Sequence, residues 1–302
     1  MLPRPRTDQP HYGAHLGDPG YWGPYVEVAL RDSGLAVGRV EAPFVGTFPT
    51  FLVGEVVVKL FGETFDGKAS YAAEAAVQNM LAGHSEIPSP ALVAKGELFP
   101  EGTGWSWPYL VTERLSGQPI RVFDRSGPGL TPVADRLGEV VARLHQLDAP
   151  PVVAERDLIP GLRRSAPDRL AQVGLPPRLV EQVSDYLIDA PAPSVLVHAD
   201  ITDDHVFLHG GGLQAIIDWG DAIVASPYYE FVAVYLDALG GSRELLGRFL
   251  ASYGLDRDGQ FPVHALQALL EFQFDAVTRV KELVNLDSVR ELDELAERLF
   301  GS

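Results

Sequence analysis

The spacing of apolar positions divides the chain into a β-rich first part and a mostly helical remainder. In the first part, short runs of β-branched and aromatic residues predict strands, and a period near 3.6 predicts two helices. The predicted strands cover residues 48–54, 55–62, 90–98 and 107–115, and the predicted helices cover residues 21–35 and 69–83. The first two strands meet at Gly54-Glu55, where we expect a hairpin turn. The turn-forming cluster "SGQP" at residues 116–119 is interpreted as the boundary between two lobes.

Beyond this cluster, the pattern predicts helices around three short central strands. The helices are expected over residues 131–147, 176–190, 228–239, 242–253, 263–284 and 288–300, and the strands over 194–197, 206–208 and 213–218. A β-rich lobe followed by a helical lobe is an α+β plan, with a ligand cleft expected between the lobes. We therefore expect a loose N-terminal segment over 1–20, a small lobe over 21–115 and a large lobe over 116–302.

Composition and charge exclude several classes of protein. No apolar run approaches the roughly 20 residues of a membrane-spanning helix, and the N-terminal segment lacks the apolar core of a secretory signal. The absence of cysteine excludes disulfides and thiolate chemistry, and a cytoplasmic monomer is the default expectation. A formal net charge of −17 disfavours nucleic acid and anionic membranes as partners and would attract a cationic small molecule, although solubility alone also explains such a charge.

A lysine inside an apolar strand suggests a buried ion pair. Lys59 lies in "VVVKLF", and a buried ammonium group needs an anionic partner because its desolvation is costly. Glu74 on the next predicted helix is a candidate, and a strand lysine paired with a helix glutamate holds the ATP phosphates in protein kinases. A lysine that extends from a strand end into solvent would satisfy the same pattern.

The stretch "HADITDDHVFLHGGGLQAIIDWG" carries the main candidates for chemistry. Asp200 follows a predicted strand, and His205 stands where the kinase catalytic loop H-R-D-x-x-x-x-N has its Asn. Asp218 is followed by Trp-Gly, as the metal-binding Asp of the kinase motif Asp-Phe-Gly is followed by Phe-Gly. The order of Asp200, His205 and Asp218 along the chain therefore fits a phosphoryl-transfer site. A metallohydrolase with His198, Asp200 and His205 binding Zn²⁺ or Mn²⁺ is the alternative. Two aspartates that only cap the loops around a hairpin would be a purely structural explanation.

Longer segments resemble the aminoglycoside phosphotransferase family. "HADITDDH", "AIIDWGDA" and "SPYYEF" look like its His-Gly-Asp and Ile-Asp-Trp regions, and "LGEVVARLHQL" is similar to its Leu-Gly…Leu-His helix. "VVVKLFGETFDG" and "LDELAERLFG" are most similar to the hygromycin B kinases of the family. The resemblance runs from about residue 21 to the end. It implies a bilobal, protein-kinase-like fold and transfer of the γ-phosphate of ATP, or of GTP, to a hydroxyl of an aminoglycoside such as hygromycin B, with Mg²⁺ or Mn²⁺.

The resemblance also implies roles for individual residues. Asp200 would be the catalytic base, and Asp218 and His205 would hold the metal ion. Lys59 would contact the ATP phosphates, and Glu74 would anchor Lys59. The hinge that offers backbone groups to adenine would comprise residues 112–115, including Thr112 and Arg114. The acids expected to hold a cationic acceptor are Asp203, Asp204, Glu230 and Asp275.

Two positions depart from the family pattern. Ala199 stands where the family has Gly, which adds a methyl group and disfavours a positive φ. His205 stands where the family has a metal-binding Asn, and an imidazole nitrogen suits Mn²⁺ better than Mg²⁺. An ATP-binding pseudokinase therefore stays open, as do other acceptors such as a macrolide or a choline-like amine.

Overall fold

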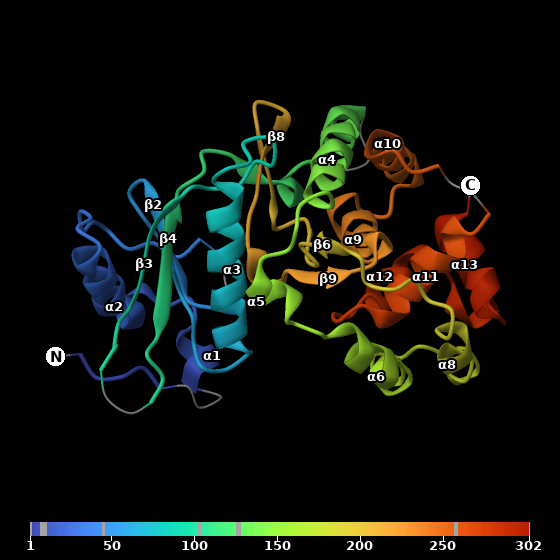
Figure 1. Ribbon diagram of the computed structural model, residues 1–302, viewed down its shortest axis with the longest axis horizontal. Helices are drawn as coiled ribbons and strands as arrows, with labels where there is room; N and C mark the ends of the chain where they lie inside the picture. Colours follow the sequence, from blue (N-terminus) through green and yellow to red (C-terminus); the bar gives the residue numbers. More distant parts are fainter. Residues whose placement is uncertain are drawn as a thin grey trace. The chain divides into compact units, whose positions relative to one another are not determined.

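The chain divides into two units in the computed structural model (Figure 1), which describes residues 2–6, 11–43, 46–101, 104–124, 128–256 and 259–301. The first unit comprises Met1–Ser85 and Ser89–Ser116, and the second comprises Glu86–Pro88 and Gly117–Ser302. A four-stranded sheet lies in the first unit, and most of the helices lie in the second. The α+β class predicted from the sequence is confirmed.

The first unit is built on an antiparallel sheet in the order β1-β2-β4-β3. Its strands are β1 (Thr50–Val53), β2 (Val56–Leu60), β3 (Leu92–Glu97) and β4 (Pro108–Glu113), and helix α3 (Gly67–Leu81) follows β2. The predicted hairpin is confirmed, because β1 and β2 pair around Gly54, whose φ of +56° suits glycine. Lys59 stands on β2 opposite Thr50 of β1 and Leu110 of β4.

Two N-terminal helices complete the core of this unit, α1 (His11–His15) and α2 (Pro19–Asp32). Tyr12 and Trp22 are 1% and 0% exposed, and their ring centroids lie 6.4 and 5.2 Å from that of Trp107. The expectation of a loose N-terminal segment is therefore wrong for residues 11–20. Single aromatic residues bury a large surface without forming the apolar run on which the prediction depends.

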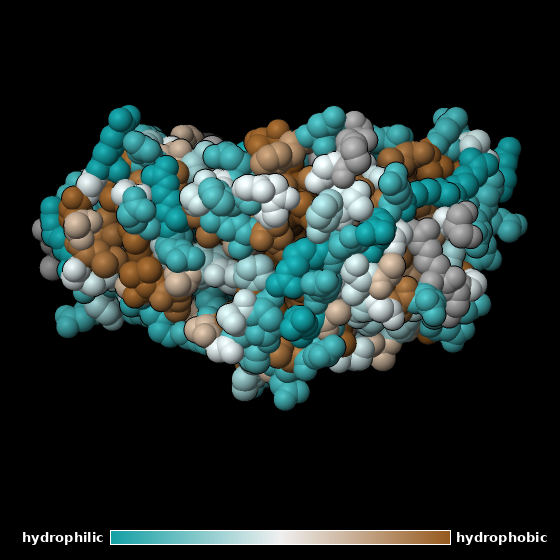
Figure 2. All heavy atoms as spheres, turned by 90° about the horizontal axis from the view of Figure 1, so that it is seen from above, coloured by the Kyte–Doolittle hydropathy of each residue, from teal (hydrophilic) through white to brown (hydrophobic). Residues whose placement is uncertain are grey.

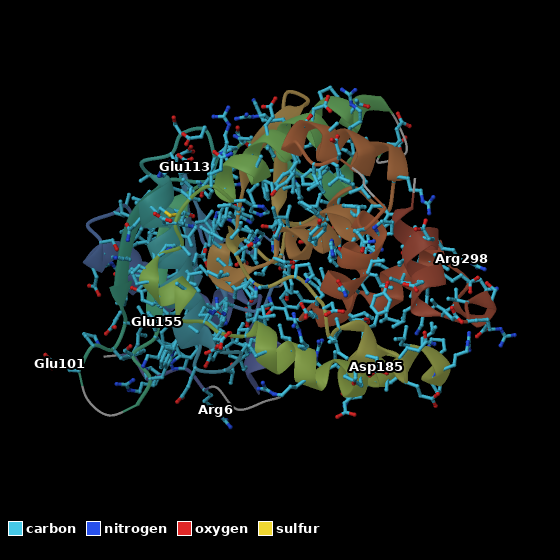
Figure 3. The ribbon with its side chains drawn as sticks, turned by 45° about the vertical axis from the view of Figure 1, so that its right-hand side comes forward. Arg6, Glu101, Glu113, Glu155, Asp185 and Arg298 are labelled. Carbon is cyan, nitrogen blue, oxygen red and sulfur yellow. The ribbon has the colours of Figure 1, made fainter. Side chains whose placement is uncertain are left out.

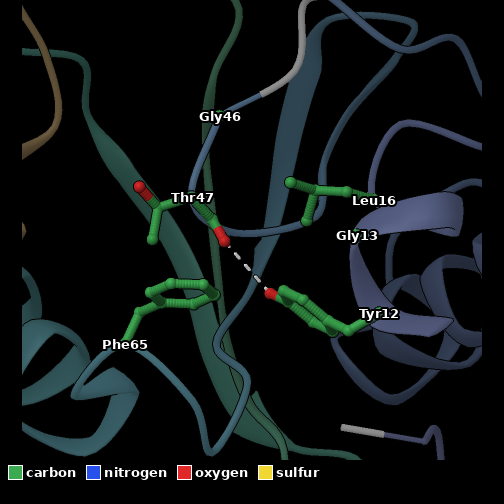
Figure 4. A pocket seen from close by; sticks show the side chains of 6 residues that line it. All are labelled: Tyr12, Gly13, Leu16, Gly46, Thr47 and Phe65. Atoms are coloured by element: carbon green, nitrogen blue, oxygen red, sulfur yellow. Dashed lines mark hydrogen bonds between the residues drawn. The ribbon is translucent and has the colours of Figure 1, made fainter. Parts of the chain in front are cut away.

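A cavity of about 250 Å³ lies beside α1. The hydroxyl of Tyr12 donates a hydrogen bond to the carbonyl oxygen of Thr47 at 3.1 Å, and the ring of Phe65 lies 6.2 Å from that of Tyr12 (Figure 4). The residues lining the cavity are Tyr12, Gly13, Leu16, Gly46, Thr47 and Phe65. The first helix thus contacts the segment that precedes β1.

The surface of the first unit is partly hydrophobic, as Figure 2 shows at its left end. Of the residues that can be described there, the large hydrophobic side chains with the greatest exposure are Val37, Phe65 and Val93. Charged side chains are exposed on both units, and those labelled in Figure 3 are Arg6, Glu101, Glu113, Glu155, Asp185 and Arg298. In the part of the chain that the structure describes, no helix has the length and apolar character needed to cross a bilayer.

The second unit contains two small antiparallel sheets and most of the helices. One sheet has the order β5-β7-β8, and the other pairs β6 with β9. The strands are β5 (Gln118–Pro119), β6 (Val195–Val197), β7 (Val206–His209), β8 (Gly212–Ile216) and β9 (Ile223–Ala225). The longer helices are α4 (Thr131–Leu144), α6 (Ile159–Gln172), α9 (Pro227–Ala233), α10 (Arg243–Tyr253), α11 (Phe261–Glu271), α12 (Val277–Leu283) and α13 (Leu292–Phe300), and the short ones are α5 (Pro151–Ala154), α7 (Pro177–Val180) and α8 (Val183–Tyr186).

Helices α4 and α10 pack closely together in the core of this unit. A Cβ atom on Gly138 would lie 2.2 Å from the carbonyl oxygen of Phe249, so this approach requires glycine. Just beyond α4, Nδ1 of His145 lies 2.9 Å from the hydroxyl of Tyr253 on α10. The predicted helix over 131–147 is therefore confirmed, and it brings His145 into the core.

Two long helical predictions need correction. Residues 176–190 form α7 and α8 instead of one helix, and the Gln182 amide between them donates to the carbonyl of Arg290 at 3.0 Å. Residues 263–284 are split after α11, where the N–H of Gln273 donates to the Tyr229 hydroxyl at 3.0 Å. These breaks depend on partners distant in sequence, which apolar periodicity does not report. Helix α6 is absent from the sequence prediction because Pro167 lies inside it.

Candidate active site

Asp200 is a largely buried carboxylate on the loop between β6 and β7. Pairing of β6 with β9 fixes the start of this loop, and the Asp200 side chain is 18% exposed. Burial raises the pKa of Asp200 to about 7, His205 opposes the rise, and the carboxylates of Asp221, Asp218 and Asp237 add to it. A carboxylate with such a pKa can accept a proton near neutral pH.

His205 connects Asp200 with Asp218. Its Nδ1 lies 2.7 Å from the carbonyl oxygen of Asp200 and 3.3 Å from Oδ2 of the same residue. Because a carbonyl oxygen only accepts, Nδ1 carries a proton, and Nε2 is the nitrogen with a lone pair when the ring is neutral. This Nε2 lies 3.9 Å from Oδ2 of Asp218. The structure thus brings these three predicted site residues together.

His198 is a structural residue rather than a metal ligand. It is 0% exposed, and burial lowers its pKa to about 4, which keeps the ring neutral. Its Nε2–H donates to the carbonyl of Ile217 at 2.9 Å, and its Nδ1 accepts the N–H of Asp200 at 3.2 Å. Both ring nitrogens are therefore occupied, and the metallohydrolase alternative is wrong. No group of three or more His, Asp or Glu residues suited to a metal ion exists among the residues described.

Glu230 holds the backbone of this loop from helix α9. It is 0% exposed, and its two carboxylate oxygens accept the N–H groups of His198 at 2.6 Å and Ala199 at 3.1 Å. His145 lies nearby, with Nε2 3.8 Å from Oε2 of Glu230. The expectation that Glu230 contacts the acceptor is therefore wrong, because a fully buried carboxylate with both oxygens bonded cannot reach a ligand. Ala199 has a φ of +70°, so the family's Gly position keeps its left-handed backbone here.

The other acids proposed for the acceptor have different surroundings. Asp204 pairs with Arg121, whose Nε lies 2.8 Å from Oδ1. Asp275 is exposed and lies just before α12, where its carboxylate accepts the N–H and the hydroxyl of Thr278 at 3.2 and 2.7 Å. Asp275 and Asp204 thus have evident structural partners.

Asp203 lies beside an acid that the sequence motifs do not indicate. Its N–H lies 3.4 Å from Oδ1 of Asp237, and the same oxygen lies 3.8 Å from Nη2 of Arg279. Burial, followed by the charge of Asp203, raises the pKa of Asp237. Asp237 lies in an apolar helical run after α9, and only the tertiary fold places it near the Asp200 loop.

In the first unit, Lys59 forms the predicted contact with Glu74. Nζ lies 2.7 Å from Oε2, and the side chains are 11% and 5% exposed. The rings of Phe48 and Phe61 lie 5.6 and 5.1 Å from the ammonium group. A lysine that extends into solvent does not fit this burial.

A closed loop precedes β1 and lies near Lys59. Glu41 and Leu52 exchange backbone hydrogen bonds of 2.9 and 2.6 Å, and the described residues 42–43 and 46–49 form the loop between Glu41 and β1. Its Phe48 ring contacts Lys59, and its Thr47 carbonyl accepts from Tyr12. The described part of this loop also contains Gly46.

The predicted hinge lies at the end of β4. Thr112 is half-buried and pairs with Val57 of β2, whereas Arg114 is exposed. The backbone N–H of Arg114 donates to the carbonyl of Glu55 at 2.8 Å, and its Nη1 donates to Gly54 at 3.2 Å. Both groups of Arg114 thus support the β1–β2 hairpin, and the contact of residues 112–115 with adenine stays a prediction.

Comparisons with known proteins identify relatives of this chain. A sequence model of the phosphotransferase enzyme family (APH) matches residues 46–272. Over 206 residues the chain is 24% identical to the lysine-specific demethylase JMJ21 of Arabidopsis thaliana, a match that covers 49% of this chain and only 22% of that protein.

Several solved structures share the fold. The GDP complex of wild-type aminoglycoside 2'-phosphotransferase-IIIa is 19% identical with a TM-score of 0.63, covering 91% of this chain and 95% of that one. The macrolide 2'-phosphotransferase MphH of Brachybacterium faecium is 21% identical with a TM-score of 0.60, covering 91% and 97%. The streptomycin–ATP ternary complex of APH(2")-IIa is 15% identical with a TM-score of 0.58, covering 93% and 98%. The family model matches most of the length of the chain, which therefore belongs to the phosphotransferase enzyme family. The solved structures show that it has the protein-kinase-like fold of that family.

Proposed function

We propose that this protein transfers the γ-phosphoryl group of ATP, or of GTP, to a hydroxyl of a cationic aminocyclitol, with hygromycin B as the first candidate. The observation that carries the proposal is the cluster of Asp200, His205 and Asp218, in which His205 Nδ1 lies 3.3 Å from Oδ2 of Asp200 and Nε2 lies 3.9 Å from Oδ2 of Asp218. A proton acceptor and two metal donors on one loop system are the parts that phosphoryl transfer requires.

Asp200 acts as the general base in this proposal. The acceptor hydroxyl gives its proton to the Asp200 carboxylate while its oxygen bonds to the γ-phosphorus, and the bond from that phosphorus to the β–γ bridging oxygen breaks. The pKa of Asp200, raised to about 7 by burial, suits this task because the carboxylate is basic enough to take the proton and still largely ionised above neutral pH.

Asp218 and His205 fit a divalent ion. Their donor atoms lie 3.9 Å apart, close enough for both to bind one divalent ion. The Nδ1–H bond to the Asp200 carbonyl leaves Nε2 as the donor nitrogen of the neutral ring. When bound, such an ion would neutralise charge on the phosphate oxygens. The imidazole donor favours Mn²⁺ over Mg²⁺.

The first unit supplies contacts to the nucleotide. Lys59 donates to the phosphates, Glu74 holds its ammonium group in place, and Thr112 and Arg114 belong to the adenine hinge. The loop closed by the Glu41–Leu52 bridge covers the phosphates in this proposal. Its support is the Phe48 ring, 5.6 Å from the Lys59 ammonium group.

The acceptor is proposed to be cationic because acids gather around Asp200. After burial, the negative charges of Asp221, Asp218 and Asp237 also raise the pKa of Asp200. Asp203 lies beside Asp237 and raises the pKa of that residue. A structural neighbour was solved with streptomycin and ATP, which is consistent with an aminoglycoside acceptor. The formal net charge of −17 acts in the same direction.

A screen of nucleotide consumption tests the proposal. Purified protein with ATP or GTP and Mg²⁺ or Mn²⁺ is offered aminoglycosides, macrolides, choline-like amines and amino alcohols, and we expect turnover with hygromycin B or another aminocyclitol. Turnover of a neutral macrolide alone would contradict the acceptor and keep the kinase. Nucleotide binding without turnover of any acceptor would support the pseudokinase alternative.

A further inference from the structure

The segment after Asp218 has a backbone that needs support. Asp218 has a φ of +65°, a conformation that costs a non-glycine residue roughly 1 kcal/mol or more. Trp219 holds one side of the segment, since it is 0% exposed and its ring centroid lies 4.5 Å from that of His198. Its indole N–H donates to the carbonyl of Ile216 at 3.2 Å. This hydrogen bond orients the indole ring. It does not involve the backbone carbonyl groups of the residues that follow Trp219.

Arg156 holds the segment through these carbonyl groups. Its Nη1 donates to the carbonyl oxygen of Gly220 at 2.8 Å and to that of Ala222 at 3.0 Å. Arg156 is half-buried and follows the short helix α5, which packs against β9 and whose Val153 is 0% exposed. The guanidinium group is thus anchored to the same sheet that begins the Asp200 loop. A charged donor shared between two carbonyl groups forms strong hydrogen bonds.

We infer that Arg156 is a positioning residue for metal binding, which fixes the backbone of residues 219–222 and thereby the direction of the Asp218 carboxylate. The inference rests on the proposed function, because it takes Asp218 as a metal ligand. Partners that orient a metal ligand typically change metal affinity or activity 10–100-fold when removed. The Asp218 side chain is 36% exposed, and its Oδ2 lies 3.9 Å from Nε2 of His205.

The test measures Mn²⁺ binding directly. Free Mn²⁺ is followed by electron paramagnetic resonance in the presence of a non-hydrolysable ATP analogue, for the wild-type protein and for Arg156→Ala, Arg156→Lys and Asp218→Asn. We expect the Mn²⁺ dissociation constant to rise about tenfold or more in Arg156→Ala and to recover in part in Arg156→Lys, which keeps one charged donor. Asp218→Asn should show the largest rise.

Arg178 provides the matched control. It also donates to two backbone carbonyls in the second unit, those of Leu286 and Val289, and both lie outside the Asp200 and Asp218 segments. Arg178→Ala should lower thermal stability about as much as Arg156→Ala and leave the Mn²⁺ dissociation constant unchanged. An unchanged constant in both Arg156 variants, with a raised one in Asp218→Asn, would overturn the inference and leave the proposed function standing. A wild-type protein that binds no Mn²⁺ with the analogue would contradict both.

Discussion

Replacing Asp200 by asparagine should abolish most of the activity and yet stabilise the folded protein at alkaline pH. Asparagine keeps the shape of the carboxyl group, so the packing around it is preserved, but it cannot accept the hydroxyl proton. We expect kcat to fall roughly 10²–10⁴-fold with little change in nucleotide affinity. The stability effect has a separate origin, namely the cost of ionising a buried carboxyl group.

The magnitude follows from the pKa of Asp200, which burial raises from its ordinary value of 3.8 to about 7. Between these values the folded protein holds a proton that the unfolded chain has lost, so the Asp200 contribution to stability declines as pH rises. It is full below pH 3.8 and lost as pH rises through about 7. One pKa unit corresponds to about 1.36 kcal/mol, which gives a loss of roughly 4 kcal/mol above pH 7. An asparagine side chain cannot ionise, so the Asp200→Asn variant escapes this loss.

Thermal unfolding without metal or nucleotide measures this difference. At roughly 2 °C per kcal/mol for a chain of this size, Asp200→Asn should unfold about 5–8 °C above the wild type at pH 8, and the gap should shrink toward pH 4. The exposed Asp185 allows the same substitution as a control, for which no pH-dependent gain is expected. Equal melting temperatures at pH 8 would refute the burial argument, and near-normal turnover would refute the role as base.

Three further substitutions test other parts of the site. Glu74→Gln should lower the free energy of unfolding by about 3 kcal/mol because it leaves the Lys59 ammonium group without its anion. The Lys59→Met, Glu74→Gln double variant should regain stability but not ATP binding. Melting temperatures measured with and without ATP test this, and a double variant that regains both or neither would contradict it. Glu230→Gln should cost about 3 kcal/mol in urea unfolding, since an amide can accept only one of the two backbone hydrogen bonds; a loss under about 1 kcal/mol would argue against it. His205→Asn should raise kcat/KM with Mg²⁺ relative to Mn²⁺, and an unchanged ratio would show that His205 is not a ligand.

The contact between Lys59 and Glu74 could be predicted because a lysine in an apolar strand needs an anionic partner. Glu74 on the next predicted helix was the candidate, and the fold places the two charged groups 2.7 Å apart. Strands β1–β4, β6–β8 and the Gly54 hairpin were also predictable, since β-rich runs and turn residues are local signals, whereas β5 and β9 were not predicted.

The roles of His198, Glu230 and Asp237 could not be derived from local sequence. His198 resembles a ligand in sequence, and only the partners of its two ring nitrogens reveal that it is structural. The sequence does not distinguish Glu230 from a contact for the acceptor, because its burial depends on how α9 packs. Asp237 and Arg156 act on loops far away in sequence, and no pattern within their own segments indicates this.

Phosphorylation of hygromycin B tests the central claim most directly. The drug is incubated with the protein, ATP and either Mg²⁺ or Mn²⁺, and its mass is compared with that from an identical reaction containing Asp200→Asn. We predict a singly phosphorylated drug with the wild-type protein and, over the same time, roughly 10²–10⁴-fold less with the variant. Equal phosphorylation by both proteins would contradict the assigned base, and an unmodified drug together with unmodified aminocyclitols of every other kind would contradict the proposed function.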